Sequence, residues 1–186
     1  MTETVPVKPQ RRMLMLLLAV FFLPLAASFA LYYSGWRPSG GTNHGELLKP
    51  LRQLPAAAKS LEGKWALVYV GDGSCGEPCR NALHIARQIH LLLNKDMDRI
   101  NRVLLATDNC CDTAFLEAGY TGIKVLDVSA PSVRSELLAL LPPGDHAHDL
   151  FVVDPLLNIL MRFDTRENPR GLLDDMKKLL KLSHIG

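Results

Sequence analysis

A long stretch without charged residues near the N-terminus suits a lipid environment, whereas the rest of the chain has the composition of a protein in water. Residues Met13 to Tyr33 contain no Asp, Glu, Lys, Arg or His. About 20 helical residues, each rising roughly 1.5 Å, cross a hydrocarbon core about 30 Å thick. A single segment that crosses lipid must form hydrogen bonds between its own backbone N–H and C=O groups, and an α-helix does this. The sequence therefore predicts one transmembrane helix over 13–33.

Basic residues next to this segment predict its orientation. Lys8, Arg11 and Arg12 precede it, whereas Arg37 is the only basic residue that follows closely. Positively charged flanks stay on the cytoplasmic side of a membrane. We therefore expect a cytoplasmic tail over 1–12, a single pass through a bacterial inner membrane and a periplasmic C-terminal part.

A cleaved signal peptide is the alternative to this anchor. Ser28-Phe29-Ala30 offers small residues at the spacing that a signal peptidase reads. The apolar stretch is longer than the usual apolar region of about 7 to 15 residues in a signal peptide. Pro24 is tolerated in a membrane helix. These two observations favour the anchor.

Composition excludes few functions for the remainder of the chain. The net charge is +2 and 22% of the residues are charged, which describes an ordinary protein surface. No basic block is long enough to indicate a nucleic-acid partner. Four cysteines can form disulfides in an exported domain, but they are too few to hold a fold together alone.

Residues 34–60 are expected to be a tether, because they carry Pro38, Pro50, Pro55 and the glycines of Ser39-Gly40-Gly41. The folded domain is expected over 61–186. It alternates short apolar runs with amphipathic helical patterns. Strands are expected over 65–70, 103–107, 124–128, 150–153 and 159–163, and helices over 79–93, 113–118 and 132–141 and from Pro169 onward. This order predicts an α/β fold, a central sheet flanked by helices, and it looks like the thioredoxin fold.

Cys75 and Cys79 directly follow the first expected strand, in Gly73-Ser74-Cys75-Gly76-Glu77-Pro78-Cys79. A strand that ends in a glycine-rich turn and opens a helix places both sulfurs near a helix N-terminus, where partial positive charge favours thiolate. The four-residue offset brings them close enough for a disulfide or for two bonds to one metal ion. Redox chemistry, binding of a soft metal and a merely structural role all stay open at this point.

Three residues separate the two cysteines, whereas dithiol oxidoreductases of the thioredoxin type have two. The longer loop suits metal coordination at least as well as disulfide exchange. Cu(I) prefers soft thiolates and low coordination numbers, and a histidine can complete a trigonal site. His146 and His148 precede the strand expected over 150–153, which adjoins the end of the first strand in a thioredoxin-like sheet. Each histidine is a candidate ligand, with a plain surface position as the alternative.

These motifs together resemble the Sco/SenC family of copper proteins, which assemble cytochrome c oxidase. The resemblance rests on CxxxC after a strand and on Asp145-His146 eight residues before Asp154-Pro155, and it covers roughly 65–163. It implies a membrane-anchored thioredoxin-like domain in which Cys75, Cys79 and His146 bind copper, and it leaves open whether the copper is held as Cu(I), as Cu(II) or as both. The partner implied is a cytochrome c oxidase subunit or another copper acceptor.

The chain departs from the family pattern at three places: beside the first cysteine, at Cys110-Cys111, and in the insertion usual between the later elements, which is shortened. Family members usually have proline directly after the first cysteine, where this chain has Gly76. Cys110 and Cys111 follow the second expected strand, where the resemblance gives no reason for cysteines. Adjacent cysteines form a disulfide only with difficulty, so we expect free or separately paired thiols. The alternative is that one of them joins the copper site or resolves a disulfide of Cys75.

Three functions remain open from the sequence. The first is delivery of copper to an oxidase, or its maturation, by a Sco-like protein. The second is a thiol-disulfide oxidoreductase acting on copper-ligand cysteines, an enzyme in which Cys75 attacks and Cys79 resolves the mixed disulfide. The third is a degenerate thioredoxin-like scaffold with a stabilising disulfide.

Overall fold

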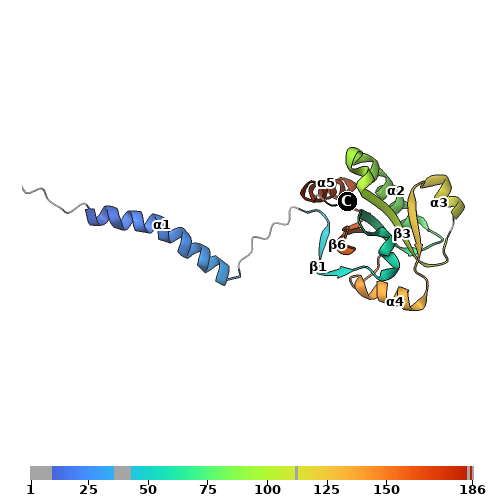
Figure 1. Cartoon of the computed structure of the whole chain (residues 1–186), viewed down its shortest axis with the longest axis horizontal. Helices are drawn as coiled ribbons and strands as arrows, with labels where there is room; N and C mark the ends of the chain where they lie inside the picture. Colours follow the sequence, from blue (N-terminus) through green and yellow to red (C-terminus); the bar gives the residue numbers. More distant parts are fainter. Residues whose placement is uncertain (1–9, 36–42, 112, 184, 186) are drawn as a thin grey trace, which may run out of the picture. The chain divides into compact units, whose positions relative to one another are not determined.

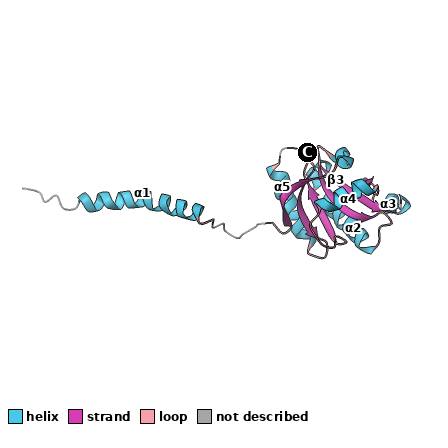
Figure 2. Cartoon of the chain, turned by 90° about the horizontal axis from the view of Figure 1, so that it is seen from below, coloured by secondary structure: helices cyan, strands magenta, loops and turns pink. Residues whose placement is uncertain are grey.

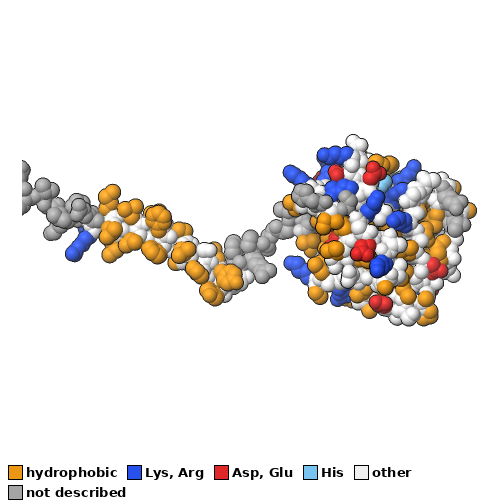
Figure 3. All heavy atoms as spheres, viewed as in Figure 1, with side chains coloured by type: hydrophobic (Ala, Val, Ile, Leu, Met, Phe, Trp, Pro, Cys, Tyr) orange, Lys and Arg blue, Asp and Glu red, His pale blue; other side chains and the backbone are white. Residues whose placement is uncertain are grey.

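The computed structural model describes residues 10–35, 43–111, 113–183 and 185, and it divides into two compact units between residues 41 and 42. The first unit contains α1 (Gln10–Tyr33), with Pro24 inside it. Among the described residues, it is the one helix long and apolar enough to cross a membrane, by length and composition (Figures 1 and 3). Lys8 and Arg37, on which the expected orientation rests, lie outside the described residues.

The second unit is built on a six-stranded mixed sheet (Figure 2). Its strand order is β1-β6-β5-β2-β3-β4. The pairs β2–β3 and β3–β4 are parallel, and the pairs β2–β5, β5–β6 and β6–β1 are antiparallel. The strands are β1 (Glu46–Gln53), β2 (Trp65–Asp72), β3 (Ile100–Asp108), β4 (Ile123–Asp127), β5 (Asp149–Val153) and β6 (Asn158–Asp164). The predicted α/β, thioredoxin-like class of fold is confirmed.

Helices cover both faces of this sheet, as Figure 1 shows. One apolar core lies between the sheet and the helices α2 (Glu77–Leu92) and α5 (Pro169–Leu182). A second core lies on the other face, under α4 (Pro131–Leu140) and the 3₁₀ helix η1 (Ala56–Leu61). A short helix, α3 (Thr113–Gly119), and a second 3₁₀ helix, η2 (Asn94–Arg99), complete the unit. The central strands are buried on both faces, which explains their continuous apolar sequences.

Part of the expected tether belongs to the sheet. Residues 34–60 were expected to link anchor and domain, but Glu46–Gln53 forms β1 and pairs with the edge of β6. The sequence signal is weak, because β1 has one neighbouring strand, exposes most of its residues and contains Pro50. Ala58 and Leu61 of η1 are also buried in the domain core. The folded domain therefore begins before residue 61, whereas residues 36–42 lie outside the described residues.

The segment before β1 is attached to α5 by a buried carboxylate. Asp175 is 3% exposed, and its Oδ2 accepts hydrogen bonds from the backbone N–H groups of His44 at 2.7 Å and Gly45 at 2.9 Å. The His44 Nδ1 atom lies 3.3 Å from the other carboxylate oxygen. A buried acceptor of this kind fixes where the chain enters the sheet.

Replacing Asp175 with alanine is expected to lower the free energy of unfolding by about 1–3 kcal/mol, because two backbone donors lose a buried acceptor. Urea unfolding of the full chain in detergent, followed by the fluorescence of the buried Trp65, measures the change. Asp174→Ala on the same helix is the matched control, and it should change stability by less than about 0.5 kcal/mol. Equal effects of both substitutions would contradict this role for Asp175.

Candidate functional site

The predicted cysteine pair lies at the carboxyl end of the central strand β2. The chain leaves β2 at Asp72, turns through Cys75, whose φ is +49°, and enters α2 at Glu77. Asp72 stabilises the turn, because its Oδ1 accepts a hydrogen bond from the backbone N–H of Ser74 at 2.7 Å. This bond, with further ones from Ser74 and Asn109, lowers the pKa of Asp72 below its usual value. Cys79 thus lies in the first turn of α2.

Cys75 and Cys79 form a disulfide, with their Cα atoms 5.1 Å apart. Both are buried, at 0% and 3% exposure. Arg80 donates a hydrogen bond from Nε to the carbonyl of Cys75 at 3.0 Å and so fixes the turn against the helix. On reduction, the sulfurs lie next to the helix N-terminus, which favours thiolates. The arrangement therefore supports reversible dithiol chemistry.

His146 comes to the same place from the loop between α4 and β5. It lines a cavity of about 460 Å³ together with Cys79, Tyr69 and Asp72. The Tyr69 hydroxyl donates to the carbonyl of Ala147 at 3.1 Å, which holds this loop across the end of β2. Burial, followed by the charges of nearby aspartates, raises the pKa of Tyr69 above its usual value, so the phenol stays a donor. The structure thus brings Cys79 and His146 to one cavity.

Both ring nitrogens of His146 are engaged in hydrogen bonds. Nδ1 lies 2.7 Å from Oδ2 of Asp149, and Nε2 lies 2.7 Å from the carbonyl oxygen of Pro142. A carboxylate and a carbonyl oxygen therefore occupy the positions at which the two ring nitrogens could meet a metal ion. The ring also packs edge-on against Phe151, with the ring centroids 5.6 Å apart. His146 must release one of these bonds before it can bind a metal ion.

Ion pairs connect this histidine to the edge of the sheet. Asp149, which is 5% exposed, also lies 3.5 Å from Nη1 of Arg162 on β6. Arg162 in turn donates to Glu46 on β1, with Nη2 2.6 Å from Oε2. Burial opposes the charge of Arg162, but the bond with Glu46 and the charge of Asp149 raise its pKa overall. The strand missed in the sequence therefore helps to position His146.

The described residues contain no preassembled group of three His, Cys, Asp or Glu side chains that holds a metal ion. Cys79 and His146 line the cavity, whereas Cys75, which is bonded to Cys79, does not line it. The donor chemistry nevertheless suits Cu(I), because reduction of the disulfide provides two thiolates beside the cavity that His146 lines. His148 does not line the cavity. Its Nδ1 is buried with no hydrogen-bond partner among the described residues, and its carbonyl accepts from Thr165.

Cys110 and Cys111 form a second disulfide, between neighbouring residues at the end of β3. Free or separately paired thiols were expected, and the structure instead joins the two. The loop lies against the first cysteine turn, because Gly73 donates from its backbone N–H to the carbonyl of Asp108 at 2.8 Å. Two parallel strands that end side by side bring both disulfides to one edge of the sheet.

The comparisons with known proteins agree with this architecture. A family model described as "Transmembrane-like, thioredoxin-like, C-terminal domain" matches residues 65–183. No curated protein matches the sequence. The apo Sco1 protein of Thermus thermophilus gives a TM-score of 0.58 at 17% identity, over 76% of this chain and 99% of that chain.

Two copper-bound structures are also similar. Yeast Sco1 gives a TM-score of 0.56 at 15% identity, over 76% of this chain and 95% of that chain. ScoI of Bradyrhizobium japonicum gives 0.51 at 18% identity, over 69% of this chain and 96% of that chain. At such low identity the likeness concerns the fold, and at that level the predicted resemblance to Sco proteins is confirmed.

The contact between the two cysteine loops requires glycine at position 73. A Cβ atom there would lie 2.7 Å from Cα of Cys110 and 2.9 Å from the carbonyl oxygen of Asn109. Gly73→Ala is therefore expected to lower the free energy of unfolding by about 1–3 kcal/mol. Gly76→Ala is the matched control, since its Cβ would meet, within the part of the chain that the structure describes, only Pro78, at 4.0 Å. Urea unfolding of both variants measures the difference, and similar losses would contradict the close packing of these loops.

Proposed function

The chain belongs to the transmembrane-like, thioredoxin-like C-terminal domain family, and on that premise we propose that it is a membrane-anchored copper-binding protein. Helix α1 would hold it in a bacterial inner membrane, with the N-terminus cytoplasmic and the folded domain periplasmic. Cys75, Cys79 and His146 would bind Cu(I). The protein would deliver copper to a cytochrome c oxidase subunit or to another copper acceptor.

The shared cavity of Cys79 and His146 is the observation that carries this proposal. These side chains come from α2 and from the loop before β5, far apart in sequence, yet they line one hollow at the end of β2. The cysteine pair provides two soft donors at a helix N-terminus, and the histidine provides a third donor of the kind that completes a trigonal Cu(I) site. The solved structures of similar fold include two Sco proteins with copper bound.

Binding would require two changes in the site. The Cys75–Cys79 disulfide must accept two electrons and two protons from a dithiol reductant, and the thiols then lose protons as they bind the metal. His146 must exchange its bond with Asp149 or with Pro142 for the metal ion. Both partners lie within four residues of His146 in the sequence, so the change can be local. Transfer would follow by ligand exchange, with cysteines of the acceptor replacing Cys75 and Cys79 in turn.

Replacing His146 with alanine is expected to weaken Cu(I) binding to the reduced full chain by at least about 10- to 100-fold, the loss that even outer-shell partners of a metal produce. Competition with a coloured Cu(I) chelator measures this affinity. His148→Ala is the matched control and should leave the affinity unchanged, because His148 does not line the cavity. Unfolding curves of both variants show whether the fold is retained.

Two results would contradict the proposed site. One is a reduced wild-type chain that binds no Cu(I). The other is an affinity that stays the same in folded Cys75→Ser or His146→Ala variants. Weaker binding in His148→Ala alone would show that the third ligand is His148 and not His146.

A second function, thiol-disulfide exchange on the copper-ligand cysteines of an acceptor, is favoured by a separate observation. The Cys75–Cys79 disulfide is formed, and His146 is held by two other hydrogen bonds. In this reaction Cys75 would attack the disulfide of the acceptor, and Cys79 would release it as a dithiol.

Reduction of an oxidised acceptor peptide with a CxxxC motif separates the two functions. If exchange is the function, Cys75→Ser should abolish reduction of the peptide by the reduced protein, while His146→Ala should retain most of the rate. Liquid chromatography of the peptide thiols gives both rates. A wild-type rate no faster than that of Cys75→Ser would exclude the enzymatic role.

A further inference from the structure

We propose that Cys110 and Cys111 are a second redox-active pair, which receives electrons from an external dithiol and passes them to Cys75–Cys79. The proposal rests on the redox-active cysteine pair of the proposed function, but it involves no copper. The two disulfides would act one after the other. Cys110–Cys111, the more exposed one, is called the outer pair, and Cys75–Cys79, the buried one at the proposed copper site, is called the inner pair.

Accessibility distinguishes the two disulfides. Cys75 is 0% exposed and Cys79, which lines the cavity of His146, is 3% exposed, so a reductant in solution meets almost none of their surface. Cys110 is exposed and Cys111 is half-buried. Thiol-disulfide exchange requires direct attack on a sulfur atom, so access decides which bond an external thiolate meets first. The outer pair is the accessible one.

The two pairs lie on loops that contact each other. The backbone of Gly73, two residues before Cys75, packs so closely on Cys110 that a side chain would not fit between them. Asn109 donates from Nδ2 to Oδ2 of Asp72 at 2.8 Å, which adds a second bond between the loops. Cys111 packs against the apolar core cluster that contains both Cys75 and Cys79.

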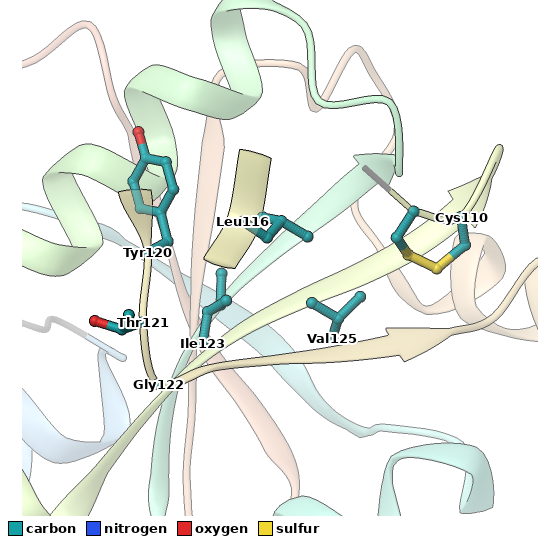
Figure 4. A pocket seen from close by; sticks show the side chains of 8 residues that line it. Cys110, Leu116, Tyr120, Thr121, Gly122, Ile123 and Val125 are labelled. Carbon is teal, nitrogen blue, oxygen red and sulfur yellow. A yellow bond between two sulfur atoms is a disulfide. The ribbon is translucent and has the colours of Figure 1, made fainter. Parts of the chain in front are cut away.

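A cavity beside the outer pair gives its side chains room to move. The cavity has a volume of about 540 Å³ and is lined by both cysteines and by Leu116, Tyr120, Ile123 and Val125. Figure 4 shows the disulfide at one end of this apolar hollow. Since a close-packed interior would hold the sulfurs in place, this space gives the side chains of Cys110 and Cys111 room to move apart when their bond opens.

Arg80 contacts both the segment of Phe115 and Tyr120, beside this cavity, and the turn of the inner disulfide. Its guanidinium carbon lies 4.7 Å from the ring centroid of Phe115 on α3, and its carbonyl accepts from the Tyr120 hydroxyl at 3.2 Å. The same residue donates to the carbonyl of Cys75. Arg80 therefore contacts both the α3 segment and the turn that carries Cys75.

The pathway balances as two successive exchanges. A thiolate of the external dithiol attacks the Cys110 sulfur and releases Cys111 as a thiolate. The second thiolate of the reductant then attacks the reductant's own sulfur in this mixed disulfide, which closes the reductant's disulfide and releases Cys110, so that the outer pair gains two electrons and two protons. The Cys111 thiolate next attacks one sulfur of the Cys75–Cys79 bond. Cys110 resolves this mixed disulfide, which restores the Cys110–Cys111 bond and leaves Cys75 and Cys79 as thiols.

Timed reduction of the oxidised full chain in detergent tests this order. Dithiothreitol is added, the reaction is quenched with acid, and new thiols are alkylated and assigned by peptide mass spectrometry. In the wild type, the outer pair should open before the inner pair. In Cys110→Ser/Cys111→Ser, reduction of the inner pair should slow by about tenfold or more, because the direct route is blocked by burial. In Cys75→Ser/Cys79→Ser, reduction of the outer pair should keep its wild-type rate.

The proposal is overturned if the inner pair of the wild type opens first, or if a folded Cys110→Ser/Cys111→Ser variant reduces its inner pair at the wild-type rate.

A trapping experiment with two double variants gives an independent result. Cys79→Ser/Cys110→Ser leaves Cys75 with Cys111, and Cys75→Ser/Cys110→Ser leaves Cys79 with Cys111. At least one should form an intramolecular disulfide on mild oxidation, and failure of both also overturns the pathway. Copper binding is measured separately, so its absence does not affect these outcomes.

Discussion

Backbone hydrogen bonding along both edges of β2 is the constraint on which the site depends. The strand is parallel to β3 and antiparallel to β5. Its carboxyl end therefore lies beside the carboxyl end of β3 and the amino end of β5. The cysteine turn at 73–76, the second cysteine pair at 110–111 and the loop that carries His146 all meet at this one edge. Each of these segments is short, and the buried strands hold them together.

In the structure the site is closed and oxidised. The inner cysteines are buried in a disulfide, and His146 is bonded to Asp149 and Pro142. Asp149 is also part of a series of ion pairs that reaches β1 through Arg162. Opening the site thus involves reduction at one side of the cavity and release of a histidine at the other. Copper binding and thiol exchange would share the first step and differ in the second.

Much of the fold was predictable because its central strands are buried on both faces and its helices have one apolar face. The strand expected over 65–70 is observed as Trp65–Asp72, and the helix expected over 79–93 is observed as Glu77–Leu92. β1 was missed, since an exposed edge strand interrupted by Pro50 has no alternating apolar pattern. Its partner β6 was predicted, so the missing information concerned long-range pairing.

The order of the strands was enough to predict that Cys79 and His146 lie near each other. The hydrogen bonds that orient the His146 side chain could not be predicted from local sequence. The bonds of His146 to Asp149 and Pro142, and the contact of Tyr69 with its loop, depend on a loop conformation that no motif specifies. The Cys110–Cys111 disulfide was likewise not expected, because adjacent cysteines pair only in an unusual backbone geometry. X-ray absorption at the copper edge of the reduced, Cu(I)-loaded full chain tests the central claim most directly. The account predicts two sulfur ligands and one nitrogen ligand, with the nitrogen lost in His146→Ala, whereas a spectrum unchanged by that substitution would contradict it.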